Sequence, residues 1–251
     1  MKSKNVFYSI VLFCILVLFI NACNKKDDAI TPKVNTTNGK TTAVFNPTIT
    51  YGTMTDQEGN IYKTVKIGNQ TWMAENLRTT KYRDGSDIPL VTVNSIWNNL
   101  KTGAYCNYNN STDDEFIATY GRLYNWFAID NSSKVAPNGW HVSTDAEWTI
   151  LVNYLGDSTI AGDILKETGT SHWSGLNTNS RNTIGFTALP SGYRYYVGGY
   201  AQKGEVAHWW SSTQFGKNDT IWSRSMNNIF SEVNRDYDLA VMGKSIRCVK
   251  D

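Results

Sequence analysis

The chain has little net charge and no concentrated basic region. Its 251 residues include 24 Lys and Arg and 22 Asp and Glu, which gives a formal net charge of +2. Lys2 and Lys4 lie in an N-terminal segment that we expect to be removed, and without them the formal charge is about zero. Nucleic-acid binding depends on a dense positive surface, and no Lys/Arg cluster interleaves with aromatic residues here. We therefore predict no nucleic-acid partner.

Histidine is also scarce, with three in the whole chain. His141, His172 and His208 share no spacing such as H-x-H or H-x₃-H, and no cysteine stands near them in sequence, so no metal site is predicted. We expect each to be a partly exposed strand or loop residue. No G-x-S-x-G motif occurs, and no acid is placed to orient His141. The sequence therefore favours a protein that is not an enzyme, and it implies no cofactor.

The N-terminus combines a short basic region with an apolar run. Val6 to Ile20 is an uncharged stretch of about fifteen residues, whereas a membrane-spanning helix needs about twenty. The pattern is typical of a signal peptide over residues 1–22, and an uncleaved anchor is the alternative. The residues before and including Cys23, INAC, resemble a bacterial lipobox. This resemblance implies that Cys23 is acylated and becomes the new N-terminus.

The residues that follow Cys23 indicate where the protein is held. Their sequence, NKKDD, resembles the export signal of many Bacteroidetes lipoproteins, which implies an outer-membrane lipoprotein exposed at the cell surface. A periplasmic location is the alternative. Residues 23–50 are rich in Thr, Asn and Lys, and they have too little apolar surface to offset the entropy of ordering. We expect them to form a flexible tether to one domain over residues 51–251.

Cysteine is scarce as well, with four in the chain. Cys14 lies in the expected signal peptide and Cys23 in the lipobox, which leaves Cys106 and Cys248 in the domain. Two cysteines in an exported domain most simply form a disulfide, and each lies in a segment expected to be a strand. The alternative is a pair of buried thiols.

The domain reads as α+β. A meander of short strands opens it, with turns at residues 56–60 and 68–69. Residues 120–129 have apolar residues at helical spacing and predict a short core helix. A second helix is expected over residues 159–167, and everything after it reads as strands separated by Gly and Asn turns.

The stretch GWHVSTDAEWTILVNYLG holds a histidine and several polar residues that could suggest an active site. Thr144 and Glu147, however, have capping-box spacing. Trp148, Leu151, Val152 and Leu155 then recur at i, i+3, i+4 and i+7, which predicts an apolar stripe facing a core. Helix initiation alone explains the polar cluster.

Several segments occur in a characteristic order: GNIYKTVKIGNQTWMAENLR, GRLYNWFAI, PNGWHVSTDAEWTIL, GFTALPSGYR, WWSST and GKSIRCVKD. They resemble the Fibrobacter succinogenes major paralogous domain, from about Asp56 to Asp251. GWHVSTDAEW with a C-terminal RCV strand also resembles the C-type lectin-like fold, in the variant of the formylglycine-generating enzymes. The resemblance implies a C-type lectin-like fold with antiparallel strands and two principal helices, preceded by a short β-meander.

The resemblance does not imply a known mechanism. Sugar-binding C-type lectins place Glu-Pro-Asn or Gln-Pro-Asp and Trp-Asn-Asp motifs on calcium. No such Pro triplet is present, and the nearest match, Trp97-Asn98-Asn99, lies far from the C-terminal strands. The formylglycine-generating enzymes need a reactive cysteine pair, whereas the two domain cysteines here are expected to form a bridge.

The loop SGYRYYVGGYAQKGE is the most suggestive surface. Its candidate ligand-binding residues are Tyr193, Arg194, Tyr195, Tyr196 and Tyr200. Tyrosine offers a large contact area at small entropic cost and Arg adds planar hydrogen bonding, although alternate tyrosines can also pack into a core. The sequence favours a non-catalytic binding or adhesion module for a glycan or protein ligand. The alternatives are a glycan-active hydrolase with paired carboxylates and a structural envelope lipoprotein with no small ligand.

Overall fold

The domain begins with a β-meander whose turns contain Gly and Asn. The computed structural model describes residues 35–175, 179–217 and 219–251. In it β1 (Gly52–Thr55), β2 (Ile61–Ile67) and β3 (Gln70–Met73) pair antiparallel. Gly68 adopts a φ of +58° in the two-residue turn between β2 and β3, as a tight hairpin turn requires. The expected meander and both of its turns are confirmed.

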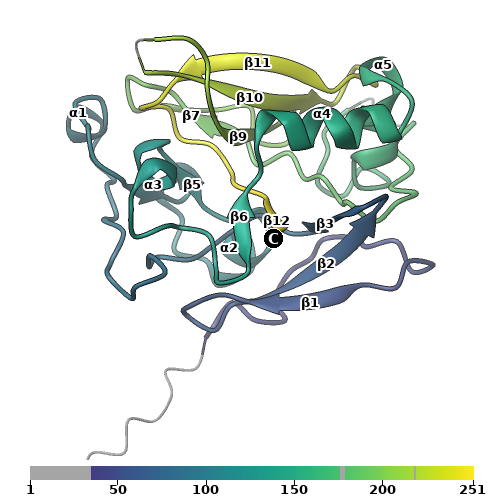
Figure 1. Cartoon of the computed structure of the whole chain (residues 1–251), viewed down its shortest axis with the longest axis horizontal. Helices are drawn as coiled ribbons and strands as arrows, with labels where there is room; N and C mark the ends of the chain where they lie inside the picture. Colours follow the sequence, from purple (N-terminus) through teal and green to yellow (C-terminus); the bar gives the residue numbers. More distant parts are fainter. Residues whose placement is uncertain (1–34, 176–178, 218) are drawn as a thin grey trace, which may run out of the picture. The chain divides into compact units, whose positions relative to one another are not determined.

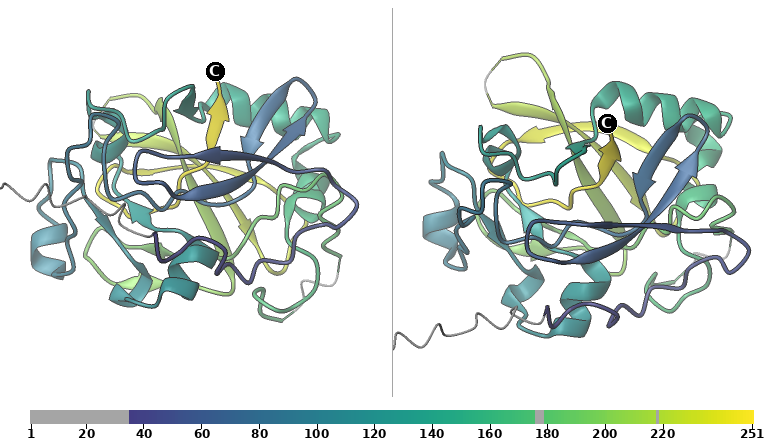
Figure 2. Two further views of the ribbon diagram at one scale, coloured as in Figure 1. Left: turned by 90° about the horizontal axis from the view of Figure 1, so that it is seen from below. Right: turned by 60° about the horizontal axis from the view of Figure 1, so that its bottom comes forward.

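The last strand of the chain completes the sheet that the meander begins. β12 (Cys248–Lys250) lies between β3 and β6 (Trp140–Val142), so the strand order is β1-β2-β3-β12-β6. Val249 pairs with Trp72 on one side and with His141 on the other. Figure 2 shows β12 beside the β2–β3 hairpin.

A second, three-stranded sheet is built from longer strands (Figure 1). β10 (Thr220–Asn227) lies between β9 (Val206–Gln214) and β11 (Asn234–Leu239), and all pairs are antiparallel. From β11 the chain runs to β12 and bridges three separate segments on its way. Its bridges are Arg194↔Gly243, Tyr124↔Lys244 and Trp209↔Ser245. This stretch therefore connects the two sheets.

The two longest helices follow β6. α4 (Asp145–Tyr154) is preceded by the expected capping box between Thr144 and Glu147. α5 (Ser158–Leu165) is capped by Asp157, whose side chain accepts a hydrogen bond from the Thr159 amide. The apolar stripe of α4 packs against β9 and β10, with Trp148 fully buried (Figures 1 and 2). Both predicted helices and the predicted cap are confirmed.

The helix expected over residues 120–129 is wrong for its first part. Gly121 has a φ of +74° and lies so close to Asn76 that a Cβ would stand 2.6 Å from its side chain. The chain then forms β5 (Leu123–Tyr124), which pairs with β4 (Tyr105–Cys106), and only α3 (Phe127–Asp130) is helical. The backbone of Tyr124 bonds with that of Lys244, so pairing with a distant segment overrides the local helical spacing.

The remaining elements are short. They are α1 (Asn94–Trp97), the 3₁₀ turn η1 (Tyr108–Asn110), α2 (Asp114–Tyr120), β7 (Tyr193–Arg194) and β8 (Tyr200–Ala201). The whole is a mixed helix and sheet structure with antiparallel strands, as the α+β prediction requires. None of the helices among the described residues is both long enough and apolar enough to cross a membrane.

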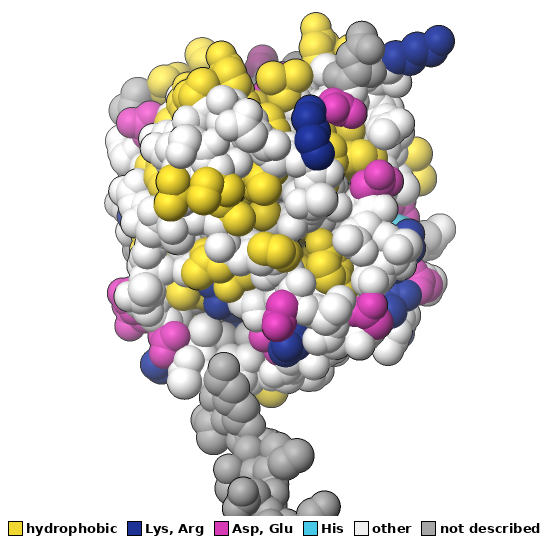
Figure 3. Space-filling model, turned by 90° about the vertical axis from the view of Figure 1, so that its left-hand side faces the viewer, with side chains coloured by type: hydrophobic (Ala, Val, Ile, Leu, Met, Phe, Trp, Pro, Cys, Tyr) yellow, Lys and Arg dark blue, Asp and Glu magenta, His cyan; other side chains and the backbone are white. Residues whose placement is uncertain are grey.

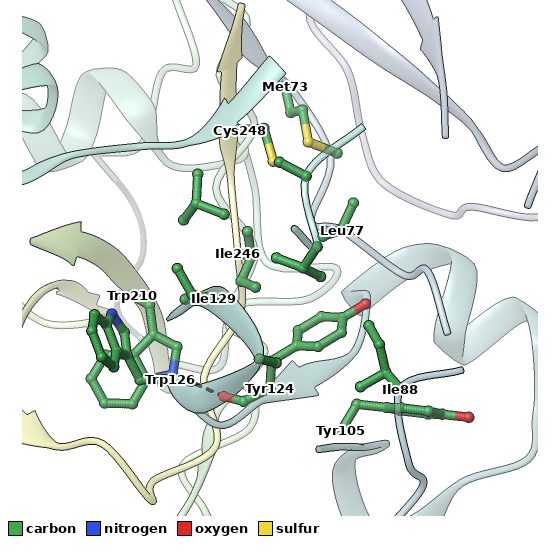
Figure 4. Close-up of a cluster of buried hydrophobic side chains, with 14 of the residues drawn as sticks. Met73, Leu77, Ile88, Tyr105, Tyr124, Trp126, Ile129, Trp210, Ile246 and Cys248 are labelled. Atoms are coloured by element: carbon green, nitrogen blue, oxygen red, sulfur yellow. Dashed lines mark hydrogen bonds between the residues drawn. The ribbon is translucent and has the colours of Figure 1, made fainter. Parts of the chain in front are cut away.

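The core contains both domain cysteines as free thiols, so the predicted disulfide is wrong. Cys248 lies in the cluster of Figure 4, beside Met73. Cys106 belongs to a separate cluster with Trp97, Ala104 and Leu123. Burial raises the pKa of both thiols. Cys248 fills apolar space in its cluster as a small buried hydrophobe, whereas Cys106 also lies beside the polar groups of Arg194 and Tyr200.

Residues 35–50, which the composition assigned to a flexible tether, pack on the domain instead. Asn35–Asp251 form one compact unit. Thr42 and Val44 bond through their amides to Thr119 Oγ1 at 3.0 Å and to Glu167 Oε1 at 2.5 Å. Phe45 and Ile49 pack against the core under α4. The few apolar and polar contacts of this strap (residues 35–50) order it although its composition is that of a linker. The expected signal peptide (1–22), Cys23 and the tether up to residue 34 lie outside the described residues.

Candidate functional site

A hollow of about 330 Å³ lies between the β7–β8 ribbon and one face of the β9–β11 sheet. We call it the tyrosine hollow. Its lining consists of Tyr193, Tyr195, Tyr196, His208, Thr220, Tyr237, Asp238, Leu239 and Met242. Three of the five residues predicted as ligand-binding are therefore brought together in one cavity.

The tight turn after β7 presents two of these tyrosines to solvent. Gly198 donates to the Tyr195 carbonyl at 2.9 Å, and Tyr195 donates to the Gly199 carbonyl at 2.7 Å. Gly198 has a φ of +98°, and a Cβ there would stand 2.5 Å from Asn94 of α1, so only glycine fits. The turn rests against α1, while Tyr195 is 40% exposed and Tyr196 is 46% exposed.

Arg194 and Tyr200 face away from the hollow, because successive side chains of a strand point to opposite faces. Arg194 is fully buried, and its guanidinium donates to the Val91 carbonyl at 2.6 Å and to the Gly198 carbonyl at 2.9 Å. It also stacks over Trp97. Tyr200 is half-buried and donates its hydroxyl to Asn110 Oδ1 at 2.7 Å. These two residues lie outside the lining and instead hold the turn in place.

His208 of β9 lies at the base of the hollow. Its ring stacks on Tyr193, with centroids 5.0 Å apart and planes at 26°. Nδ1 is buried, with no hydrogen-bond partner in the described part of the chain. Burial, and secondarily the nearby Lys244 ammonium, hold the pKa of His208 well below its usual range. The ring is therefore neutral at physiological pH, and it adds no positive charge to the hollow.

Asp238 of β11 supplies the carboxylate of the lining. Its Oδ2 accepts from the ammonium of Lys244, a fully buried residue, and from Ser223 Oγ at 3.2 Å. Burial lowers the pKa of Lys244, although Asp238 opposes the shift. Oδ1 of Asp238 has no partner among the described residues, and the side chain is 26% exposed. One carboxylate oxygen therefore remains open to a ligand.

Tyr237 contributes little aromatic surface to the hollow, although it belongs to the lining. It neighbours Asp238 on β11, so its side chain projects to the opposite face of the sheet. There its ring stacks on Phe215 with centroids 4.2 Å apart and meets Trp222 edge-on. The aromatic side chains of the hollow are therefore His208 and the three tyrosines around the turn.

Apolar side chains are exposed around α1 and the turn after β7. Figure 3 views the end of the domain that carries α1, and hydrophobic side chains gather in several groups on this face. Large exposed residues next to the turn are Leu90, Val93, Ile96 and Val197, each more than 50% exposed. Such a concentration marks a surface suited to contact with another molecule.

A second hollow, of about 380 Å³, contains His141. Its Nδ1 lies 2.7 Å from Asp251 Oδ1, and its Nε2 lies 2.6 Å from Glu147 Oε1. The expectation that no acid orients His141 is therefore wrong, because one partner comes from the far end of the sequence. Burial alone would lower the pKa of His141, but the two hydrogen bonds outweigh it and raise the pKa. Both ring nitrogens are held by carboxylates.

A third hollow, of about 500 Å³, lies beside α4 and is lined partly by Arg224 and Arg235. Arg224 NH1 lies 2.6 Å from Asp145 Oδ1, and Arg235 NH2 lies 2.7 Å from Asp145 Oδ2. Arg224 also donates to the Asp145 carbonyl and to Thr149 Oγ1. The guanidinium groups of Arg224 and Arg235 are therefore already paired with Asp145.

The acidic loop before α2 caps a helix. Asp113 accepts from the Glu115 amide at 2.9 Å, and Asp114 pairs with Lys40 at 3.0 Å. Within the described ranges, no group of three or more His, Cys, Asp or Glu side chains is arranged to hold a metal ion.

Sequence reasoning missed His208, Asp238 and Lys244. His208 and Asp238 lie at inward positions of β9 and β11, and strand alternation would place each on one face of its strand. Which faces meet depends on the register of β10 against both neighbours, and no local pattern specifies it.

The chain was compared with families, curated proteins and solved structures. No curated protein and no solved structure matches it. The sequence pattern of the Fibrobacter succinogenes major domain matches residues 65–250, which span β2 to β12 and include every residue of the tyrosine hollow. The chain therefore belongs to the Fibrobacter succinogenes major domain family.

Proposed function

We propose that this protein is a non-catalytic binding module that captures a glycan or protein ligand in the tyrosine hollow. The observation that carries the proposal is the exposure of Tyr195 and Tyr196 on a turn locked from behind by the buried Arg194. Rigid, exposed aromatic side chains give binding energy without a large ordering cost. The exposed apolar side chains of α1 and of the turn add surface near Tyr195 and Tyr196 that a ligand can contact.

The polar groups around the hollows favour binding over catalysis. His141 has both nitrogens bonded to carboxylates, so neither is free to take a proton from a substrate. A glycan-active hydrolase needs two carboxyl groups beside the scissile bond. Within the described lining of the tyrosine hollow, Asp238 is the one carboxylate, and one of its oxygens is held by Lys244.

The proposal includes the cell-surface anchor and the fold type. Acylation of Cys23 would hold the module on the outer membrane, with residues 24–34 before the strap. The order of early strands, α4, α5 and terminal antiparallel strands agrees with a C-type lectin-like arrangement.

Metabolic labelling with a radioactive fatty acid tests the anchor: the native chain takes the label and Cys23→Ala does not. Cleavage by protease added to intact cells tests surface exposure.

Ligand capture tests the binding role. The full chain, kept in a polyoxyethylene detergent, is screened against a glycan array and immobilised polysaccharides and proteins, with and without EDTA. We expect the double variant Tyr195→Ala/Tyr196→Ala to lose capture. Tyr154→Ala removes a 62% exposed tyrosine from α4 and is the matched control that keeps it. Equal capture by both variants would place the ligand elsewhere, and loss with EDTA would indicate a metal-dependent site.

A further inference from the structure

Acidic groups exceed basic groups on the face of the sheet that forms the tyrosine hollow. Asp236 and Asp238 alternate onto this face of β11, and Lys244 is the buried base beside them. Asp238 is paired with Lys244. Asp236 accepts from Ser225 Oγ at 2.7 Å, and no Lys, Arg or His of the described chain lies within ion-pair distance of it. Two carboxylates and one ammonium leave one excess negative charge on this face of the sheet, because His208 is neutral. Asp236 supplies that charge from beside the hollow, since it lies on the same face but outside the lining.

The lining offers the tyrosine hydroxyls and one open carboxylate oxygen as hydrogen-bonding groups for a ligand. Oδ1 of Asp238 is open, but Nδ1 of His208 is buried and Oδ2 of Asp238 is occupied. A sugar ring brings several hydroxyl groups, and each one left without a partner would weaken binding. A primary ammonium group is strongly hydrated and would lose most of its water contacts for one carboxylate oxygen.

Aromatic side chains and excess negative charge together suit a cation that does not donate hydrogen bonds. We propose that the tyrosine hollow binds a methylated ammonium group, such as the trimethylammonium head of a choline-type ligand, an inference that rests on the proposed binding function. Such a cation is attracted to the electron-rich faces of aromatic rings, and this attraction grows when the site is shielded from water. A cavity of about 330 Å³ holds the head with part of the attached chain.

The buried Lys244 does not prevent this binding. Its ammonium is bonded to Asp238 and to Ser223 Oγ at 3.0 Å, so its charge is balanced on the side that faces the hollow. It also lies over the ring of Trp210, 4.5 Å from the centroid. The sheet face thus already holds one cation against an aromatic ring, with a carboxylate as its partner.

Ligand-detected NMR on the full chain tests the inference. Choline and tetramethylammonium are compared with 3,3-dimethylbutan-1-ol, which has the shape of choline without its charge, and with a panel of neutral monosaccharides. We expect choline to bind roughly tenfold more tightly than the neutral alcohol, a difference of about 1.4 kcal/mol. Tyr195→Leu and Tyr196→Leu should each weaken choline binding roughly two- to thirtyfold, because they keep apolar volume and remove a ring.

Two further variants separate ring chemistry from folding. Tyr196→Phe keeps the ring and should bind choline more tightly than Tyr196→Leu does, whereas Tyr154→Leu on α4 should leave choline binding unchanged. Equal binding of choline and the neutral alcohol, or no choline binding by the folded chain, would overturn the inference. Monosaccharide binding in the hollow without choline binding would overturn it too, while leaving the proposed binding function intact.

Discussion

Each face of the β9–β11 sheet holds a buried basic side chain paired with an aspartate, but the two aspartates differ in exposure. Beneath α4, Arg224 is paired with Asp145, whose side chain is 12% exposed. On the opposite face Lys244 is paired with Asp238, whose side chain is 26% exposed. α4 covers Arg224 on the first face, whereas the second face opens beside Asp238 into the tyrosine hollow. The same strands therefore hold a covered ion pair on one face and a partly open ion pair on the other.

Neutralising Asp145 should have the largest effect. Asp145→Asn leaves the guanidinium of Arg224 buried beneath α4 without its charge partner, and guanidinium does not lose its proton. We expect the free energy of unfolding in urea to fall by about 3 to 5 kcal/mol. Asp114→Asn removes a solvent-screened ion pair with Lys40 and should change the stability far less. Similar losses in both variants would contradict the closed character of the α4 face.

Neutralising Asp238 should have a smaller effect that depends on pH. Asp238→Asn leaves Lys244 unpaired, but a buried lysine can release its proton. We expect a loss of about 1 to 3 kcal/mol near pH 7. Because the pKa of Lys244 is already lowered in the folded state, the unfolded chain binds more protons and stability rises with pH. Urea unfolding between pH 6 and 9 should show this rise in Asp238→Asn and a flat loss in Asp145→Asn.

His208 should make the hollow face sensitive to acid. Its folded pKa is depressed, so the unfolded chain takes up a proton near pH 6.5 that the folded chain refuses. The neutral ring contributes fully to the free energy of unfolding above pH 6.5, and this contribution is lost as the pH falls below 6.5. Thermal unfolding of His208→Gln from pH 7.5 to 5.0 should show a shallower decline than the native chain. Parallel declines would mean that the folded ring takes up its proton at the same pH as the unfolded ring, so that burial does not depress its pKa.

His141 should give a pH dependence of stability with the opposite sign. Its folded pKa is raised, so its contribution is complete below pH 6.5 and is lost as the pH rises through the folded pKa. The ring is 38% exposed and solvent screens its ion pairs, so we expect less than about 1 kcal/mol. His141→Gln should therefore lower the melting temperature more at pH 5.5 than at pH 8.5.

Changes at the exposed tyrosines should affect stability least. Tyr195→Leu and Tyr196→Leu should each shift the free energy of unfolding by no more than about 0.5 kcal/mol, because both side chains are largely exposed. A larger loss in urea unfolding would mean that these rings support the fold, and their effect on ligand capture would then need another explanation.

Local signals in the sequence were sufficient for several elements. The Thr144–Glu147 cap and the stripe of α4 depend on residues within three turns of one another, and the Gly68 turn on two residues. The helix expected over residues 120–129 failed because Tyr124 pairs with Lys244, more than a hundred residues away. Composition could not show that the strap packs on the domain, since its bonds to Thr119 and Glu167 are also long-range.

The candidate site was predictable in part. Tyr193, Tyr195 and Tyr196 were found because aromatic residues in a Gly-rich loop are a compositional signal. Arg194 was included with them and is instead buried, since strand alternation separates it from its neighbours. The pairing of Cys106 with Cys248 followed from their number alone, and number does not say that each fills a different cluster.

The position of β12 constrains when the protein can fold. The five-stranded sheet lacks an interior strand until residues 248–250 are available, and Arg247 supplies bonds to Met73 and Phe186 at the same time. During synthesis the meander therefore leaves the ribosome without its partner strand, and contacts of such long sequence separation form slowly. The five-stranded sheet can therefore be completed only after nearly all of the chain has been made.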